Sequence, residues 1–550
     1  MNQKFETIIK YLIGIEKGED SLSKINIPEQ FCMEKKDKPA IAKNLNAAFL
    51  IALSGKSHSL YKQALHYLND FQTHPTWKKI VSFYQEGLDH IHSEITDRCL
   101  TDVSFKEQLN DLCAWISKPE NRKQRKETIE KIWQMFFPEG VALSESKNRP
   151  EKIYQLRQKR KVKITKLNPA PITKPAEELL FTSNILVTLP FSDMDIDNLP
   201  IISSLRPRLK EIRQEPQVFW YDHPIPIGID PKQNEAIHGL TGLENAVTYE
   251  IQKGNATENT KLTCVLSVSV THKGLHDIIK KYLEEEIKKQ KNMPHLEVYL
   301  FTETDTQKLI EEILVPIVKK EMGSKNYNLL YEIFGVDGEY GRHYSFLKAI
   351  SAFWQVFINP KIKGTFKIDL DQVFPQEKLV EQTGISAFEH FKTPLWGAEG
   401  LDYEGNKVVL GMLAGALVNK EHIEHSLFYP DVDFPPQDVA ADEIIFLSRL
   451  PQALSTAAEM MTRYTDDILD GRNQVIQRVH VTGGTTGILV NALRKYRPFV
   501  PTFIGRAEDQ AYILSMLFSG SPYLRYLHKD GLIMRHDKKA FAREVIKAAA

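Results

Sequence analysis

Two aspartates separated by a single residue, Asp369 and Asp371, interrupt the apolar run FKIDLDQVFP at residues 366–375. Aspartate is a poor strand residue, so its place at the end of a strand-like pattern needs a reason. Side chains alternate along a strand, which puts both carboxylates on one side, where they suit a hard divalent cation that also grips a diphosphate. Two solvated acids in a surface turn are the competing interpretation.

The segments around these acids alternate between strand and helix patterns. They are LTCVLSVSV before GLHDIIKKYLEEEIKK, HLEVYLF before DTQKLIEEILVPIVKKEM, and RHYSFLKAISAFWQVF before TFKIDLDQVF. This order predicts an α/β domain with a largely parallel sheet. Open α/β sheets bind ligands beyond the carboxyl ends of their strands, and Asp369 and Asp371 are expected at such an end.

The patterns along the chain change twice. Residues 1–150 carry helical periodicity without strand signals, as in FETIIKYLIGI and AIAKNLNAAFLIAL. Residues 151–260 begin as a basic connector rich in proline and continue into strand-like runs such as NILVTLPF. We therefore expect an α-helical N-terminal region at 1–150, an intermediate segment at 151–260 and the catalytic α/β domain at 261–550.

The motifs between residues 261 and 540 resemble, in their order, glycosyltransferases with the GT-A fold, especially family 2. LTCVLSVSVTHKGLHDIIKKYL is similar to the family's first strand and helix, and HLEVYLFTETDTQKLIEEIL to its second unit, although Thr302 and Glu303 stand where acidic residues are usual. FKIDLDQVF matches the Asp-X-Asp strand, and a Gly-Gly loop, an acidic pair and a histidine come after it. The resemblance implies a Rossmann-like, mostly parallel sheet and a nucleoside diphosphate sugar as donor.

By this resemblance a divalent cation is bound by Asp369, Asp371 and His536, and His528 is the near rival of His536. Imidazole favours Mn²⁺ over Mg²⁺, because magnesium prefers an all-oxygen shell. Such a cation would neutralise the charge that develops on the leaving diphosphate. We therefore predict Mn²⁺ or Mg²⁺ as the cofactor.

The resemblance also implies roles for residues outside the cation site. In an inverting enzyme Asp509, next to Glu508, would be the catalytic base, whereas in a retaining enzyme these acids would position the acceptor. The Gly483–Gly484–Thr485 loop would approach the sugar or acceptor, because glycine allows close contact; a flexible turn is the alternative. The expected donor-binding residues are Ser267, Lys273, Glu303, Arg342 and Asp369.

Two further segments carry polar residues that could belong to a site. PDVDFP carries a second Asp-X-Asp, Asp431 and Asp433, but it lies between prolines, which favours a loop of solvated acids. YDHPIPIGIDPKQNEAIHGL at 221–240 concentrates polar residues, including His238, around prolines. That density suggests a site wall contributed by a segment that folds against the catalytic domain.

The bulk composition restricts location and partners. Lys plus Arg and Asp plus Glu are equal at 71 each, so no overall charge recruits nucleic acid. The four cysteines show no CxxC spacing, which suits a reducing, cytoplasmic compartment. The longest uncharged apolar run, VVLGMLAGALV at 408–418, is shorter than the roughly 20 residues of a membrane-spanning helix, so we expect no transmembrane segment.

The predicted function is a metal-dependent glycosyltransferase that moves a hexosyl group from a nucleoside diphosphate sugar to the hydroxyl of a small or soluble acceptor. One alternative is a sugar-phosphate nucleotidyltransferase, which would carry a glycine-rich basic loop directly after its first strand. Another is a binding or scaffold protein that keeps the α/β domain without catalysis, an interpretation that the altered second unit, TETD, supports.

Overall fold

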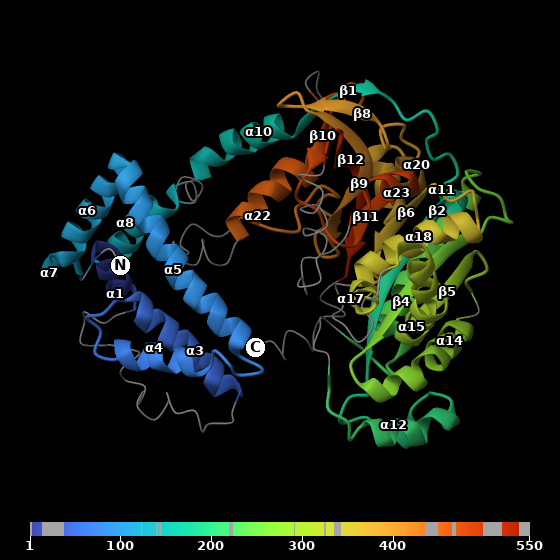
Figure 1. The fold of residues 1–550 in the computed structure, drawn as a ribbon. Coiled ribbons are helices and arrows are strands. Elements are labelled where there is room, and N and C mark those ends of the chain that lie inside the picture. The colour runs from blue at the N-terminus through green and yellow to red at the C-terminus, as the bar shows by residue number, and fades with distance from the viewer. Residues whose placement is uncertain are drawn as a thin grey trace. The chain divides into compact units, whose positions relative to one another are not determined.

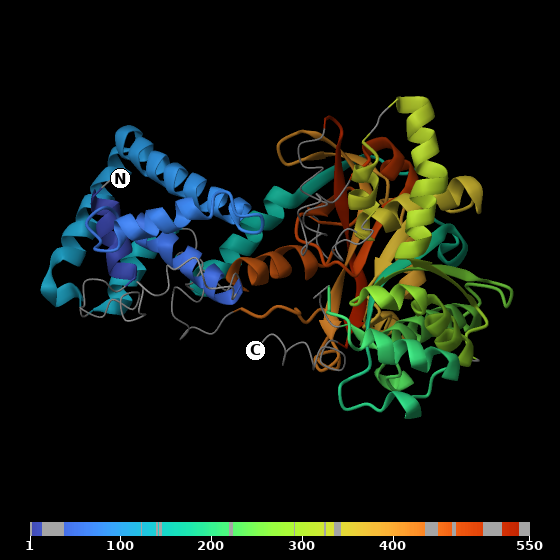
Figure 2. The same ribbon diagram turned by 60° about the horizontal axis from the view of Figure 1, so that its bottom comes forward.

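The computed structural model describes residues 3–13, 38–122, 124–138, 141, 146–218, 224–290, 292–323, 326–334, 343–434, 449–464, 469–498 and 520–537. Contacts divide the chain into two units, 1–149 with 435–451, and 150–434 with 452–550. We describe each unit by itself and call them the helical unit and the sheet unit (Figure 1 and Figure 2).

The described part of the helical unit contains helices and no strand. Its apolar residues recur three and four apart, so each helix buries one stripe in one of two small cores, around Phe105 and Leu109 and around Leu45 and Leu68. Asp102 caps α6 by accepting a hydrogen bond from the Phe105 amide. These helices lie within the region, residues 1–150, for which the sequence predicted helical periodicity. The helices are α1 (Gln3–Leu12), α3 (Lys38–Leu53), α4 (Tyr61–Asp70), α5 (Lys78–Thr101), α6 (Val103–Ser117), α7 (Pro119–Arg122) and α8 (Arg125–Phe136).

The sheet unit is built on one 12-stranded sheet. Its strands are β1 (Lys161–Lys166), β2 (Leu179–Thr188), β3 (Ile225–Pro226), β4 (Leu262–Val270), β5 (Leu296–Thr302), β6 (Gly364–Ile368), β7 (Gln372–Val373), β8 (Glu399–Asp402), β9 (Lys407–Asn419), β10 (Gln474–Arg478), β11 (Thr485–Leu489) and β12 (Tyr523–His536). Its helices of five or more residues are α10 (Arg149–Arg160), α12 (Arg206–Ile212), α13 (Glu235–Gln252), η6 (Lys273–Asp277), α14 (Ile279–Lys289), α15 (Glu303–Leu309), η7 (Ile310–Leu314), η8 (Val318–Met322), α17 (Asn328–Phe334), α18 (His343–Phe357), α19 (Gln376–Thr383), α20 (Ala387–Phe391), α22 (Arg449–Ser455), η10 (Thr456–Met460) and α23 (Val490–Tyr496).

Four strands form a region that we call the parallel half, in the order β5-β4-β2-β6, with every neighbouring pair parallel. One face of these strands packs on α13, α14 and α20 through a large core that includes Phe181, Leu266 and Leu240. The opposite face packs on α18 through Leu180 and Phe346. Helices on both faces are what near-continuous apolar strands such as LTCVLSVSV require.

Five of the remaining strands form a closed barrel. β11 is antiparallel to both β6 and β9, so it joins the parallel half to this barrel. From β9 the order continues through β8, β1, β10 and β12, and β12 pairs back onto β9 in parallel, which closes a five-stranded ring. We call this ring the barrel half.

The predicted fold class is therefore wrong. We expected the mostly parallel, Rossmann-like sheet of a GT-A fold, but seven of the twelve strand pairings in the described residues are antiparallel and five strands close into a mixed barrel. The reason lies in pairings between distant segments. KVKITK, expected within a basic connector, is β1, and the apolar run at 408–418 lies in the long strand β9.

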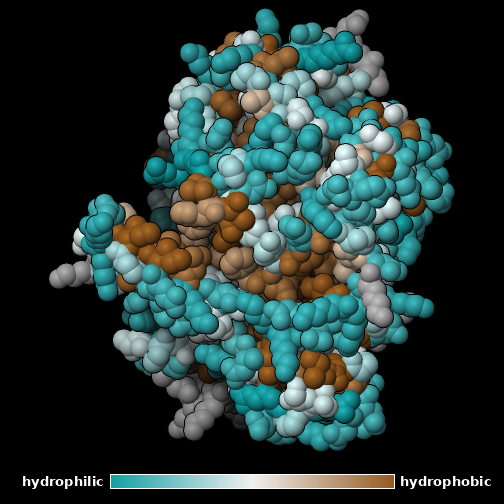
Figure 3. All heavy atoms as spheres, turned by 90° about the vertical axis from the view of Figure 1, so that its right-hand side faces the viewer, coloured by the Kyte–Doolittle hydropathy of each residue, from teal (hydrophilic) through white to brown (hydrophobic). Residues whose placement is uncertain are grey.

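The parallel half has an open edge strand, whereas the ring of the barrel half is closed. β5 is the end strand of the sheet, and it lies on the side of the sheet unit where Figure 3 shows apolar patches among polar residues. Large apolar side chains are exposed on β5 and on the chain after it: Tyr299, Ile313, Ile317, Met322, Leu329, Val356 and Phe357. A closed ring has no such edge. No helix in the described ranges is long and apolar enough to cross a membrane.

Candidate active site

Asp369 and Asp371 lie in a tight turn at the carboxyl end of β6. The strand ends at Ile368, and the Gln372 amide donates to the Asp369 carbonyl oxygen at 3.1 Å. The two carboxylates are therefore not held on one side of a strand by its alternation, and each contacts different residues. The Asp369 side chain is 39% exposed, whereas that of Asp371 is only 4% exposed.

The buried carboxylate of Asp371 contacts His536; cation binding by these two residues stays a prediction. β12 pairs with β7 so that His536 lies opposite Gln372, and the Asp537 amide donates to the Asp371 carbonyl oxygen at 2.9 Å. This register brings His536 Nε2 to 2.8 Å from Asp371 Oδ2. The pair is thus assembled from residues far apart in the chain by backbone pairing alone.

A second histidine and acid lie directly beside this pair. Asp537 Oδ2 is 3.6 Å from His238 Nε2, 3.4 Å from Lys420 Nζ and 3.3 Å from Arg535 Nη2. Burial lowers the pKa of His238, and the negative charges of Asp537 and Asp371 oppose that shift. The buried Asp537 carboxylate thus has three basic side chains around it, and these contacts can hold the strand end beside Asp371 in place.

His238 reaches the site because α13 packs tightly against the turn. A Cβ on Gly239 would come within 2.7 Å of the Leu370 carbonyl oxygen, and one on Gly242 within 2.4 Å of the Val373 side chain. Only glycine allows this approach. The polar segment 221–240 thus contributes, through its last residues, a wall next to Asp371. Residues 219–223 lie outside the described residues.

One buried lysine, Lys367, pairs with Asp369 and a second, Lys348, lies close enough to Lys367 to feel its charge; sequence reasoning did not single them out. Lys367 Nζ is 2.6 Å from Asp369 Oδ1, and Gln372 Nε2 donates to Oδ2 at 3.2 Å. Lys348, on α18, is as buried as Lys367, at 3% exposure. Burial, and then the charge of Lys367, lower the Lys348 pKa to about 7. A lysine inside an apolar strand or helix face, as in TFKI and FLKAI, was the available signal.

The Gly483–Gly484–Thr485 loop lies against Asp369. Thr485 pairs with Ile368, the last residue of β6. A Cβ on Gly484 would lie 2.5 Å from Asp369 Oδ2 and 2.4 Å from the Gln372 side-chain amide. A larger residue here would have to displace the ends of the Asp369 and Gln372 side chains, so the loop and these two side chains are packed in direct contact.

Other predicted residues lie within or directly after the neighbouring parallel strands. Ser267 is buried in β4, opposite Asn184 of β2, and Lys273 is exposed in the loop after that strand. Glu303 begins α15 directly after β5, and its Oε2 is 3.7 Å from His276 Nε2. All three belong to the carboxyl edge at which Asp369 lies.

His528 is separated from the site. It pairs with Ala414 in β9, whereas His536 pairs with Asn419, so about 17 Å of strand lies between them. Its Nε2 is instead 2.8 Å from the Thr462 carbonyl oxygen. The second Asp-X-Asp also comes after a loop and not after a strand of the sheet. Arg342, Glu508 and Asp509 lie outside the described residues.

The donor set suits a cation with few protein ligands. Among the described residues, no group of three or more His, Cys, Asp or Glu side chains could hold a metal ion. Asp371 and His536 nevertheless present one oxygen and one nitrogen at a shared point. Magnesium, and manganese in the same role, are commonly held by one or two protein groups, with substrate phosphates and water as the other ligands. Asp369 would have to release Lys367 to join them.

Comparison with known proteins gives no relative for this chain. No protein-family model matches it, and neither the curated proteins nor the solved structures contain a significant match. The chemistry of the carboxyl edge is therefore the basis for assigning a function.

Proposed function

We propose that this protein transfers a sugar from a nucleoside diphosphate sugar to an acceptor hydroxyl, with a divalent cation held at Asp371 and His536. The observation that carries the proposal is the 2.8 Å approach of His536 Nε2 to Asp371 Oδ2 at the carboxyl edge of parallel strands. That edge is where sheets of this kind bind their ligands.

The electrostatics of the edge favour an anionic leaving group. When a glycosidic bond to a diphosphate breaks, negative charge grows on the phosphate oxygens, and a bound Mn²⁺ or Mg²⁺ would neutralise it. Lys367, which pairs with Asp369 at 2.6 Å, adds positive charge at the turn. Buried cations act more strongly than exposed ones because less water screens them.

The protein's own groups would have separate tasks in this proposal. Asp371 and His536 would orient the donor through the cation, and the Gly484 backbone would come close to the bound sugar next to Asp369. Asp509, with Glu508, stays the predicted group that takes the acceptor proton or positions the acceptor. The three described cysteines, Cys99, Cys113 and Cys264, are free thiols, which supports the cytoplasm as the place of action.

Donor binding is the first test. The protein would be screened by thermal shift against UDP- and GDP-sugars, with Mn²⁺, with Mg²⁺ and with chelator, and repeated on Asp371→Asn and His536→Gln. A ligand that binds only the folded state raises its stability, by about 2.7 kcal/mol at 100 times Kd. We expect a shift that needs the cation and is lost in both variants.

The matched control is Asp530→Asn, which removes one carboxylate from β12 next to Lys529, on a different part of the same strand. It should keep the nucleotide-dependent shift. If no nucleotide sugar shifts the melting temperature of the wild-type protein under any cation condition, the scaffold interpretation replaces transfer.

Product analysis separates transfer from nucleotidyl chemistry. A glycosyltransferase releases a nucleoside diphosphate, whereas a sugar-phosphate nucleotidyltransferase exchanges pyrophosphate with a nucleoside triphosphate. We expect slow, cation-dependent release of nucleoside diphosphate from the bound donor, measured by chromatography. Exchange of labelled pyrophosphate instead would assign the second activity.

A further inference from the structure

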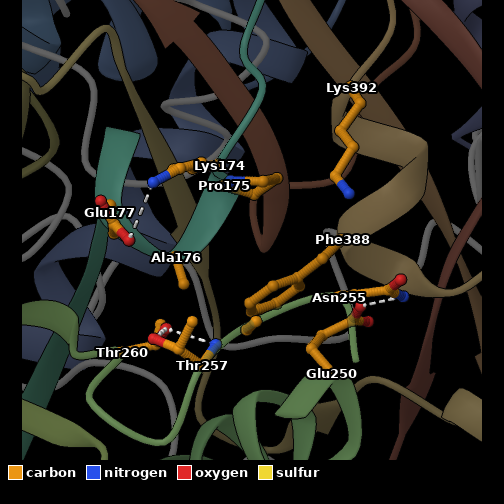
Figure 4. Close-up of a pocket in the computed structure, with 11 residues that line it drawn as sticks. Lys174, Pro175, Ala176, Glu177, Glu250, Asn255, Thr257, Thr260, Phe388 and Lys392 are labelled. Carbon is orange, nitrogen blue, oxygen red and sulfur yellow. Dashed lines mark hydrogen bonds and ion pairs between the residues drawn. The ribbon is translucent and has the colours of Figure 1, made fainter. Parts of the chain in front are cut away.

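A small cavity opens at the edge of the sheet opposite the candidate site, next to the amino ends of β2 and β4. Its volume is about 90 Å³. It lies between the segment before β2, the loop before β4, and α20 (Figure 4). The residues that line it are Lys174, Pro175, Ala176, Glu177, Glu250, Asn255, Ala256, Thr257, Thr260, Phe388 and Lys392.

One side of the cavity is apolar. Phe388 and Ala176 are buried, at 2% and 6% exposure, and Pro175 lies beside them. The Phe388 ring cannot move aside easily, because it packs against the rings of Phe181 and Phe374. A rigid apolar wall of this kind favours a hydrocarbon group over water.

Most of the charged groups around the cavity already have partners. Lys174 Nζ is 3.8 Å from Glu177 Oε1. The buried Glu250 carboxylate accepts hydrogen bonds from Asn255 Nδ2 at 2.9 Å and from Gln376 Nε2 at 3.3 Å. Thr257 and Thr260 bond to each other. These groups need no ligand for their satisfaction.

Lys392 is different from these groups. Its ammonium makes no hydrogen bond or ion pair with any residue that the structure describes, and the residue is only partly exposed. In Figure 4 its side chain extends toward the space on one side of the Phe388 ring, while Glu250 and Asn255 lie on the other side of that ring in this view. A single positive charge therefore borders an apolar wall.

We propose that this cavity binds a short-chain monocarboxylate, with the carboxylate on Lys392 and the hydrocarbon chain on Phe388, Pro175 and Ala176. A volume of about 90 Å³ is several times what a single water needs, so the cavity has room for a small ligand of a few non-hydrogen atoms. An ammonium and a carboxylate form a stronger hydrogen bond than neutral groups do. The ligand class follows from the Lys392 ammonium, which has no partner among the described residues, from the apolar wall and from this size.

The test uses butyrate as the probe and saturation-transfer NMR on the full-length protein. Three matched molecules separate the parts of the proposal: acetate keeps the charge and shortens the chain, butanol keeps the chain without charge, and butylamine reverses the charge. We expect butyrate to bind with a millimolar Kd, at least tenfold more tightly than each of the others. Equal binding of butylamine and butyrate would overturn the charge assignment and with it the proposal.

Two variants locate the ligand in this cavity. Lys392→Met keeps the stem of the side chain and removes its charge, so butyrate affinity should fall at least tenfold. Ala176→Leu fills the cavity and should abolish binding. Lys174→Met is the control, because Lys174 is paired with Glu177 and is 69% exposed, and it should bind like the wild type.

Butyrate binding that is unchanged in Lys392→Met would show that it binds elsewhere and would overturn the proposal. Melting temperatures of all variants are measured alongside. Should Ala176→Leu not fold, Lys392→Met is decisive by itself, because Lys392 is partly exposed and its loss leaves the core unchanged.

Discussion

The parallel half and the barrel half of the sheet unit are made by different kinds of pairing. In the parallel half, β4 pairs with β5 across one helical connection, although β2 also pairs with β6, which lies far along the chain. In the barrel half, β1 pairs with β8 and with β10, which lie far along the chain. The first kind of pairing is visible in local patterns and the second is not.

The two halves also differ in the side chains that they expose and bury. The parallel half ends at an open strand, β5, with exposed apolar side chains around it. The barrel half has no open strand, and histidines are buried in it and around it. Closing a ring removes the hazard of an exposed edge, but it makes stability depend on distant pairings and on groups that resist protonation.

The largest effect is expected when a charge is placed inside the barrel. Val162 is fully buried in β1, where it pairs with both Asp402 and Val475. Val162→Asp should lower the free energy of unfolding by more than about 4 kcal/mol, because an unpaired carboxylate cannot be solvated there. Lys163→Asp, at the next, exposed position, should cost less than about 1 kcal/mol, as measured by urea denaturation.

The same variant tests whether the halves unfold together. Cys264 is buried in β4 of the parallel half, and burial raises its pKa to about 12, so it should resist alkylation in the native protein. Since β11 pairs with both halves, we expect Val162→Asp to expose Cys264 to alkylation as well. Cys113, in the helical unit, should be unaffected. A protected Cys264 in this variant would mean that the halves are independent.

The second-largest effect is expected in acid, which should lower the stability of the barrel half. Burial lowers the pKa of His528 and His390 to about 3 and that of His480 to about 4. The unfolded chain takes up these protons near pH 6.5, before the folded protein does, so stability is constant above pH 6.5 and is lost as pH falls toward 3. Between pH 7 and 4.5 the loss should be on the order of a few kcal/mol.

Hydrogen exchange at pH 7 and pH 5, corrected for intrinsic rates, shows which strands lose stability in acid. Amides of β10 and β12 should lose protection before those of β4. His390→Gln keeps a donor for the Thr383 hydroxyl, which lies 3.0 Å from His390 Nε2, and should reduce the pH dependence. Equal loss of protection in β4 and β12 would contradict a weakness that is specific to the barrel half.

An intermediate effect is expected at the strand that joins the halves. A Cβ on Gly487 in β11 would lie 2.8 Å from the Thr365 carbonyl oxygen and 3.0 Å from the rings of Phe366 and Trp396. Gly487→Ala should destabilise the protein by about 1–3 kcal/mol, because backbone and aromatic neighbours must shift. Gly520→Ala meets nothing within 4 Å and should change the midpoint of denaturation little.

The smallest effect is expected for a surface ion pair of the barrel. Lys166 Nζ and Glu399 Oε1 lie 3.4 Å apart between β1 and β8, and both side chains are more than half exposed. Lys166→Ala should change stability by less than about 0.5 kcal/mol, because water screens the pair. A larger loss, measured in the same urea series as Val162→Asp, would mean that the pair helps to set the register of β1.

Much of the parallel half could be predicted from local sequence. LTCVLSVSV and HLEVYLF correspond to strands β4 and β5, and HYSFLKAISAFWQVF forms α18, because their apolar periodicities of two and of three to four survive in the fold. The barrel half could not be predicted in this way. KVKITK alternates, but half of its residues are lysine, and its strand character depends on two partners that no local pattern identifies.

The candidate site shows the same division. Asp369, Asp371 and the Gly484 loop were predicted from short motifs, and the meeting of Asp371 with His536 was expected from the order of motifs. Lys348 and Lys367 were missed because a lysine in an apolar segment is usually solvated at its tip. His238 and Asp537 were missed as partners because only the packing of α13 on the turn brings them together.

Closure of the ring also determines when β1 can find its partner strands during biosynthesis. β1 leaves the ribosome long before either of its neighbours, since about 230 residues separate it from β8, or roughly 10–50 s of translation. Throughout that interval the backbone amides and carbonyls along both sides of β1 have no native partner. The nascent chain is therefore most prone to wrong association between the synthesis of β1 and that of β10, and slower elongation over this stretch should lower the yield of folded protein.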